Sequence, residues 1–161
     1  MKITFEKYER LYLEEMTQTW NEILEDGVAF PGEKFYSAAD FEKMLAEQSA
    51  VTCMFYDGKY VGYFVMHPNN IGRCSHIGNA SYCIDKSARG KGGFSALVAQ
   101  SIKQAAHLGF SGLQFNAVVA SNLAALHTYI KNGFSIIGTV PAGFRLKDGT
   151  LSDMHILYRA V

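Results

Sequence analysis

A glycine-rich segment between an expected strand and an expected helix is the first place in this sequence where chemistry could be done. It reads Arg89-Gly90-Lys91-Gly92-Gly93 and leads into a helical pattern that begins at Phe94. Glycines let the backbone approach a ligand closely, and a helix N-terminus offers free N–H groups with a partial positive charge. Together with the two cationic side chains, these features predict a binding site for a polyanion such as a pyrophosphate.

The spacing of these residues distinguishes between the known phosphate-binding patterns. The pattern G-x-x-x-x-G-K-[ST] is absent because Lys91 is followed by Gly92, and G-x-G-x-x-G is absent because Ser95 occupies the last glycine position. The pattern that fits is [RQ]-x-x-G-x-[GA], with Arg89 first, Gly92 fourth and Phe94 sixth, where Gly or Ala is usual. A flexible turn is the alternative, but it would not explain the flanking Arg and Lys.

The fitted pattern resembles the coenzyme A pyrophosphate loop of the GNAT (GCN5-related) N-acetyltransferases. A second motif strengthens the resemblance, because Asn122, Ala125, Tyr129 and the pair Gly133-Phe134 match the N-x-x-A, Tyr and Gly-Phe positions common in that family. The two motifs cover roughly residues 77–140. The resemblance implies acetyl-CoA as cosubstrate and an acetyl transfer to an amine.

The resemblance also implies roles for two residues of the second motif. Tyr129 would donate a proton to the departing coenzyme A thiolate, and Asn122 would line the cofactor. Each has a simpler alternative. Asn is a favoured helix N-cap, and a Tyr on an amphipathic helix is often an ordinary core residue.

The strand expected before the glycine-rich segment would hold the rest of the cofactor. Pantetheine contains amides, so it can pair with Tyr82, Cys83 and Ile84 like an additional strand. Its diphosphate would then lie on the segment from Arg89 to Phe94, and a backbone N–H near Tyr82 or Cys83 would stabilise the oxyanion. Cys83 lacks an evident His partner, which disfavours it as an acyl-carrying nucleophile.

The general base common in this family is missing from the expected strand. Many GNAT enzymes carry a Glu there, whereas this chain has Asn79, which cannot accept the proton. With Asn116, Asn79 belongs to a signature that resembles the L-azetidine-2-carboxylate (proline-analogue) N-acetyltransferases, whose matching asparagines hold a small amino acid. The resemblance implies that both residues orient the acceptor at the catalytic site. Hydrogen bonding at strand ends or at a bulge is the alternative, although Asn is disfavoured within strands.

Two further residues are candidates for binding the acceptor. Phe30 lies in an aperiodic aromatic stretch, residues 28–36, which is either a lid or a packed connection. Arg145 follows Pro141-Ala142-Gly143, and its guanidinium could pair bidentately with a substrate carboxylate. A solvated loop arginine is the simpler interpretation of Arg145.

The periodicity of apolar residues predicts the elements that must position these groups. Asp57-Gly58 between two runs rich in Val, Tyr and Phe is a strong hairpin signal. Strands are expected at 2–7, 50–56, 59–67, 76–85, 113–119, 134–140 and 154–159. Helices are expected at 10–25, from Ser37 or Asp40 to 45, at 94–108 and at 122–132, with a turn-rich excursion at 141–150. This order predicts an α/β fold, a GNAT-like mixed sheet of about seven strands flanked by about four helices.

Composition limits the other functions. A length of 161 residues and a hydrophobic content of 48% fit one domain spanning residues 1–161. Fifteen basic and fifteen acidic residues cancel, so there is no overall field to attract nucleic acid or an anionic membrane. Three cysteines without a C-x-x-C pair argue against disulfides or zinc, and no signal peptide or membrane span is evident. A cytoplasmic location is expected.

These observations predict an acetyl-CoA-dependent N-acetyltransferase that acts on a small-molecule amine, such as an amino acid or an analogue. Two alternatives stay open. One is acetylation of a protein or peptide, and the other is a catalytically idle acyl-CoA-binding module, because Phe94 departs from the family pattern and the Glu is missing. GNAT enzymes are often dimers, so a homodimer is one expected oligomeric state.

Overall fold

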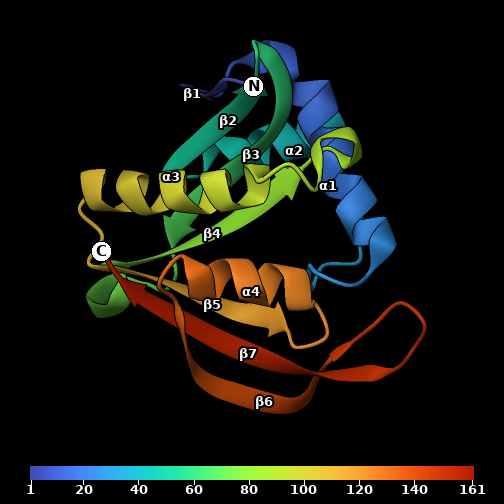
Figure 1. Cartoon of the computed structure of the whole chain (residues 1–161), viewed down its shortest axis with the longest axis vertical. Coiled ribbons are helices and arrows are strands. Elements are labelled where there is room, and N and C mark those ends of the chain that lie inside the picture. The colour runs from blue at the N-terminus through green and yellow to red at the C-terminus, as the bar shows by residue number, and fades with distance from the viewer.

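The computed structural model describes residues 1–161, which form seven strands and four α-helices (Figure 1). The strands are β1 (Ile3–Lys7), β2 (Ala50–Tyr56), β3 (Lys59–Pro68), β4 (Ile77–Ile84), β5 (Gly112–Val119), β6 (Ser135–Arg145) and β7 (Leu151–Ala160). The helices are α1 (Leu13–Asp26), α2 (Ala38–Ala46), α3 (Gly93–His107) and α4 (Leu123–Lys131). All seven strands belong to one sheet in the order β1-β2-β3-β4-β5-β7-β6, which confirms the expected mixed α/β class.

The sheet is divided into two halves where β4 meets β5. β1 to β4 run antiparallel one after another, and β5, β7 and β6 form a second antiparallel group. Between the halves, β4 and β5 are parallel and pair at two positions, Ile77 with Gly112 and Gly78 with Leu113. The two strands separate beyond these pairs, so the sheet is split toward the carboxyl ends of β4 and β5.

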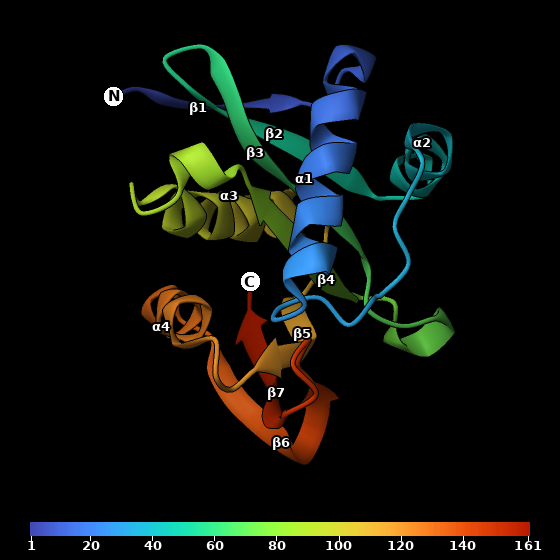
Figure 2. The same cartoon turned by 90° about the vertical axis from the view of Figure 1, so that its right-hand side faces the viewer.

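Apolar residues at helical spacing decide which face of the sheet each helix covers. α1 buries Leu13, Met16 and Ile23 in one cluster, together with side chains of α2. α3 buries Leu97 and Val98 in a second cluster on the opposite face. Figure 2 shows α1 and α2 on one side of the sheet and α3 and α4 on the other. None of the helices is both long enough and apolar enough to cross a lipid bilayer.

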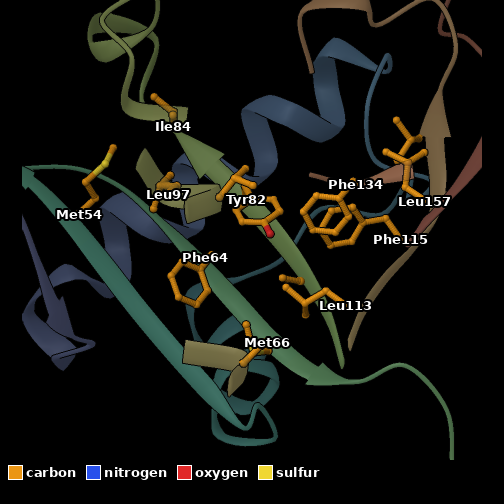
Figure 3. Packing of buried hydrophobic residues seen from close by; sticks show 14 of the residues in the cluster. Met54, Phe64, Met66, Tyr82, Ile84, Leu97, Leu113, Phe115, Phe134 and Leu157 are labelled. Carbon is orange, nitrogen blue, oxygen red and sulfur yellow. The ribbon is translucent and has the colours of Figure 1, made fainter. Parts of the chain in front are cut away.

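The second cluster connects the two half-sheets where their strands no longer pair. Figure 3 shows Tyr82 of β4 beside Phe115 of β5 and Phe134, which precedes β6. The rings of Phe115 and Phe134 are stacked with centroids 4.7 Å apart, and the Tyr82 ring lies 5.8 Å from that of Phe115. These aromatic contacts replace backbone pairing on the α3 and α4 side of the split.

The last hairpin differs from its sequence-based prediction. We expected a strand to end at Val140 and an excursion over 141–150, but β6 continues to Arg145 and only residues 146–150 form the turn. Pro141 is accommodated because β6 is an edge strand, where a missing N–H is tolerated. The register shifts nearby, and Ala142 takes a φ of 51° while its N–H donates to Asp153 Oδ1 at 2.9 Å.

Candidate active site

A cavity of about 810 Å³ passes through the split in the sheet. Its wall combines α1 and the segment after it, β4, β5, and the first turns of α3 and α4. Most of the site residues predicted from the sequence line it, namely Phe30, Asn79, Tyr82, Ile84, Arg89, Gly90, Gly92, Phe94, Asn116, Asn122 and Tyr129. The structure therefore brings both sequence motifs and both asparagines to one cavity that reaches the two faces of the sheet.

The open edge of β4 forms one wall of this cavity. Residues 79–84 pair with β3 on one side, and on the other side β5 has already diverged. Backbone N–H and C=O groups on an unpaired strand edge can bind an extended chain that carries amides. Only the backbone of Cys83 belongs to this edge, because its side chain is fully buried in the α1 cluster. Burial raises the pKa of that thiol to about 12, so it stays protonated and is not a nucleophile.

The glycine-rich segment presents the start of α3 to the same cavity. Gly90 and Gly92 have φ values of 75° and 79°, in the left-handed region that favours glycine. Gly92 is the N-cap residue of α3, so the free N–H groups of the first helical turn lie beside the lining residues Arg89 and Phe94. Free N–H groups, a helix dipole and a guanidinium together form an anion site.

Besides Cys83, two residues predicted to bind the cofactor, Lys91 and Gly93, do not line the cavity. The Lys91 ammonium donates to the backbone oxygen of Ser87 at 3.1 Å instead. Gly93 is buried, and a Cβ at this position would collide with the hydroxyl group of Tyr56. Gly93 therefore lacks a side chain because Tyr56 packs against the start of α3, a reason that the sequence pattern did not reveal.

An aromatic cage holds Tyr129 against the cavity. The rings of Tyr82, Phe94, Phe115 and Phe134 have centroids 4.9 to 6.0 Å from the Tyr129 ring. Phe94 stands where the phosphate-loop pattern usually has Gly or Ala, and its ring contributes to this cage. The departure from the pattern is therefore explained by core packing.

The chemistry of Tyr129 follows from this environment. Burial raises the pKa of Tyr129 above its ordinary value of 10, so the phenol keeps its proton at neutral pH. The hydroxyl group makes no hydrogen bond within the protein and is free to donate to a bound ligand. Asn122, about two helical turns before Tyr129, also lines the cavity, and its side chain accepts the Ala125 N–H at 3.3 Å and so caps α4.

The two predicted asparagines are connected by a third one that sequence reasoning missed. Asn69 Oδ1 accepts hydrogen bonds from Asn79 Nδ2 at 3.0 Å and from Asn116 Nδ2 at 2.6 Å. Asn116 lies in a bulge of β5, where three steps from Phe115 to Val118 match two steps on β7. Bulges redirect side chains in this way next to functional sites. Asn69 sits in a polar turn sequence, and nothing in that sequence indicates its partners.

The charged residues of the cavity lining, Asp26 and Arg89, lie together beside the glycine-rich segment. Asp26 is the only acidic residue in the lining, and its carboxylate lies 3.9 Å from the Arg89 guanidinium and 3.7 Å from the Lys86 ammonium. Arg145 is exposed on β6 and outside the lining, so the structure does not bring it to the acceptor candidates. No group of three or more His, Cys, Asp or Glu side chains is arranged to hold a metal ion.

Comparison with known proteins identifies the family. Residues 7–134 match the model of the acetyltransferase (GNAT) family. The chain belongs to this family. N-acetyltransferase aca1 of Schizosaccharomyces pombe is 33% identical over 87 residues, which are 54% of this chain and 42% of that protein. The chain therefore matches less than half the length of this curated relative.

Solved GNAT structures share the whole fold. A GCN5-related N-acetyltransferase from Kribbella flavida is 27% identical with a TM-score of 0.92, covering 99% of this chain and 98% of its own. A GNAT superfamily phosphinothricin acetyltransferase from Sinorhizobium meliloti, in complex with acetyl-CoA, is 20% identical with a TM-score of 0.92, covering 100% of this chain and 89% of its own.

The cavity fits acetyl-CoA, the cosubstrate of GNAT enzymes. The open edge of β4 suits the amides of pantetheine, and the start of α3 with Arg89 suits a diphosphate. Tyr129, Asn79 and Asn116 line the same cavity.

Proposed function

We propose that this GNAT protein transfers the acetyl group of acetyl-CoA directly to the amine of a small molecule while both are bound. The observation that carries the proposal is the single cavity that reaches both faces of the split sheet. Two substrates can enter such a cavity from opposite faces and meet between β4 and β5. Direct transfer is favoured because the buried thiol of Cys83 is neutral and faces α1.

Each group on the wall has a role in this proposal. Bound acetyl-CoA supplies a thioester carbonyl and a thiolate leaving group. A backbone N–H of β4 near Tyr82 donates to the carbonyl oxygen as negative charge develops there. Tyr129 holds the proton that the leaving sulfur needs. Because Asn79 is not a base, the acceptor reacts as its neutral amine and its proton passes to water.

A small acceptor is favoured because the segment after α1 is packed against the helix. Within residues 28–36, the Phe30 ring lies 4.7 Å from the Trp20 ring. Tyr36 exchanges two backbone hydrogen bonds with the side chain of Asn21, both 2.9 Å long. Because these contacts hold the segment against α1 beside the cavity, they restrict the space for a polypeptide acceptor. These contacts favour the interpretation of residues 28–36 as a packed connection over their interpretation as a lid.

The acceptor end is polar and carries no charge, which suits an amino acid or an analogue held by amides. Asn79 and Asn116 are the residues that would hold it. A proline analogue, the substrate class of the subgroup that the sequence resembles, is our specific proposal. Acetylation of a protein or peptide is the alternative activity.

The test is release of coenzyme A thiol from acetyl-CoA in the presence of free amino acids, cyclic imino acids, polyamines and short peptides. The proposal predicts release with small amino or imino acids and little with peptides. Release with peptides alone would establish the alternative activity. Binding of acetyl-CoA without release on any amine would identify an idle acyl-CoA-binding module.

We propose that residues 1–161 form one acetyltransferase domain, and on this proposal the protein acts as a single catalytic unit. The proposal places the protein in the cytoplasm, where acetyl-CoA is available and the three free cysteines would stay reduced. A homodimer is proposed on family resemblance, and its molar mass in sedimentation equilibrium would decide the oligomeric state.

A further inference from the structure

Asn69 is an unassigned residue that joins the two halves of the sheet behind the acceptor end of the cavity. It follows β3, and its backbone N–H donates to the Ile77 oxygen of β4 at 2.8 Å. Its side-chain oxygen accepts from Asn79 on β4 and from Asn116 on β5, at 3.0 and 2.6 Å. Asn79 and Asn116 line the cavity, whereas Asn69 does not.

We propose that Asn69 is a positioning residue for the acceptor amine. Its one oxygen fixes the side-chain amides of Asn79 and Asn116 across the split and leaves Asn79 Oδ1 available to accept an N–H from the acceptor. This inference rests on the proposed function, because it assigns the orientation of the residues that would bind the amine.

The donors and acceptors in the cluster determine how its side-chain amides are oriented. A side-chain amide can present either its oxygen or its nitrogen, so an isolated Asn79 would offer both. In the structure Asn69 presents its oxygen to both neighbours, and because an oxygen has no proton to donate, both neighbours direct Nδ2 toward it. Gln114 Nε2 donates to Asn116 Oδ1 at 2.9 Å, which engages both atoms of that amide. Asn79 Oδ1 is thus the amide oxygen left without a partner on the cavity wall.

The position of Asn69 is itself fixed, as this role requires. Its backbone bond to Ile77 lies next to the two positions where β4 and β5 pair. The backbone of Asn69 therefore keeps a fixed position relative to both β4 and β5. Asn70, the next residue, is exposed, and its side chain accepts only the N–H of Ile71 at 2.7 Å. Asn70 is therefore a matched control with the same residue type and no contact to the cavity.

The experiment measures steady-state kinetics with the best amine from the thiol-release panel for Asn69→Leu, Asn69→Asp and Asn70→Ala. Leu has the same branching at Cγ but no acceptor atom, so Asn69→Leu should raise the KM for the amine about tenfold, the usual effect of one lost hydrogen bond. The KM for acetyl-CoA should stay unchanged. Asp can still accept both N–H groups, so Asn69→Asp should restore a KM near that of the wild type, and Asn70→Ala should behave as wild type.

Other outcomes would overturn the inference. Equal changes of both KM values in Asn69→Leu, or an Asp variant as impaired as the Leu variant, would mean a general structural role. If the wild type acetylates no amine, the proposed function fails, and assigned ¹⁵N spectra of the side-chain amides test Asn69 separately. Asn69→Leu should then shift the Nδ2 signals of Asn79 and Asn116, and unchanged signals would refute the positioning role.

Discussion

Contacts with aromatic rings hold the Tyr129 side chain in place, so its position does not depend on its hydroxyl group. Removing only the hydroxyl group leaves every ring contact in place, so Tyr129→Phe should keep the KM for acetyl-CoA. The leaving sulfur then lacks its proton donor, and kcat should fall about 100-fold, a typical loss for a general acid. Steady-state kinetics with the best amine measure both constants.

The control for this prediction is Tyr8→Phe. The Tyr8 hydroxyl group likewise has no hydrogen-bond partner, but it is buried and Tyr8 lies outside the cavity lining. Tyr8→Phe should leave kcat unchanged. A wild-type kcat in Tyr129→Phe would remove the proposed acid role of Tyr129.

The missing base predicts an unusual pH profile. Asn79 cannot take a proton, and Asp26 is engaged with Arg89 and Lys86. Only the neutral amine reacts, so kcat/KM should rise about tenfold per pH unit below the pKa of the acceptor amine. Burial raises the pKa of Tyr129 above 10, so its acid form persists and no decline should occur below pH 10.

This profile is measured from pH 6 to pH 10 for the wild type and for Asp26→Asn. Both should show the same rise, because Asp26 takes no proton from the amine. If Asp26→Asn alone abolished the rise or moved its midpoint, Asp26 would be the base after all.

Arg89 and Lys91 are both cations of the glycine-rich segment, but the structure gives them different orientations. Arg89 lines the cavity, whereas Lys91 donates to Ser87 outside it. Arg89→Ala should weaken coenzyme A binding roughly 10- to 100-fold, the range for hydrogen bonds to a charged group. Lys91→Ala should change the dissociation constant little. Calorimetric titration measures both, and equal losses would contradict the orientation of Lys91.

At the level of elements, the end of α1 is fastened to the turn between β6 and β7. Gly27 has a φ of 62°, and its oxygen accepts the Lys147 N–H at 3.1 Å. A Cβ on Gly27 would lie 2.6 Å from Lys147 Cβ, whereas one on Gly58, with a φ of 82°, would meet nothing within 4 Å. Gly58→Ala should cost only the left-handed backbone penalty of about 1–2 kcal/mol in the free energy of unfolding.

Gly27→Ala should cost clearly more than Gly58→Ala, because it adds the contact with Lys147 to the same backbone penalty. Urea unfolding of the two variants measures the difference. If the two losses were equal, the turn would not be closely packed against α1.

Most elements could be predicted from the sequence because their signals are local. Gly27, Gly109 and Gly133 mark helix ends, and each takes the left-handed conformation there. The strand β6 was predicted too short because Pro141 usually ends a strand. Pro is tolerated within an edge strand, and edge position is a property of the finished sheet.

The two motifs of the candidate site could also be predicted from the sequence, but the contacts between distant residues could not. Both motifs are continuous in sequence, so their residues could be found before the fold was known. The role of Asn69 could not be, because its partners lie 10 and 47 residues away. The packing of Gly93 likewise depends on Tyr56, a residue of a distant strand.

At the scale of the whole molecule, two half-sheets meet along a short seam and enclose a cavity between them. A ligand that contacts β4 on one half and the start of α4 on the other should stabilise the complete fold. Free coenzyme A at 100 times its dissociation constant would add about 2.7 kcal/mol to the free energy of unfolding.

The central claim is that acetyl-CoA binds in the split between β4 and β5. Amide hydrogen exchange with and without acetyl-CoA tests it most directly, because the acceptor need not be known. The account predicts slower exchange in residues 79–84 of β4 and residues 90–96 at the start of α3, with β1 and β2 unchanged. Binding that leaves β4 and the start of α3 unprotected, or that protects another surface instead, would contradict it.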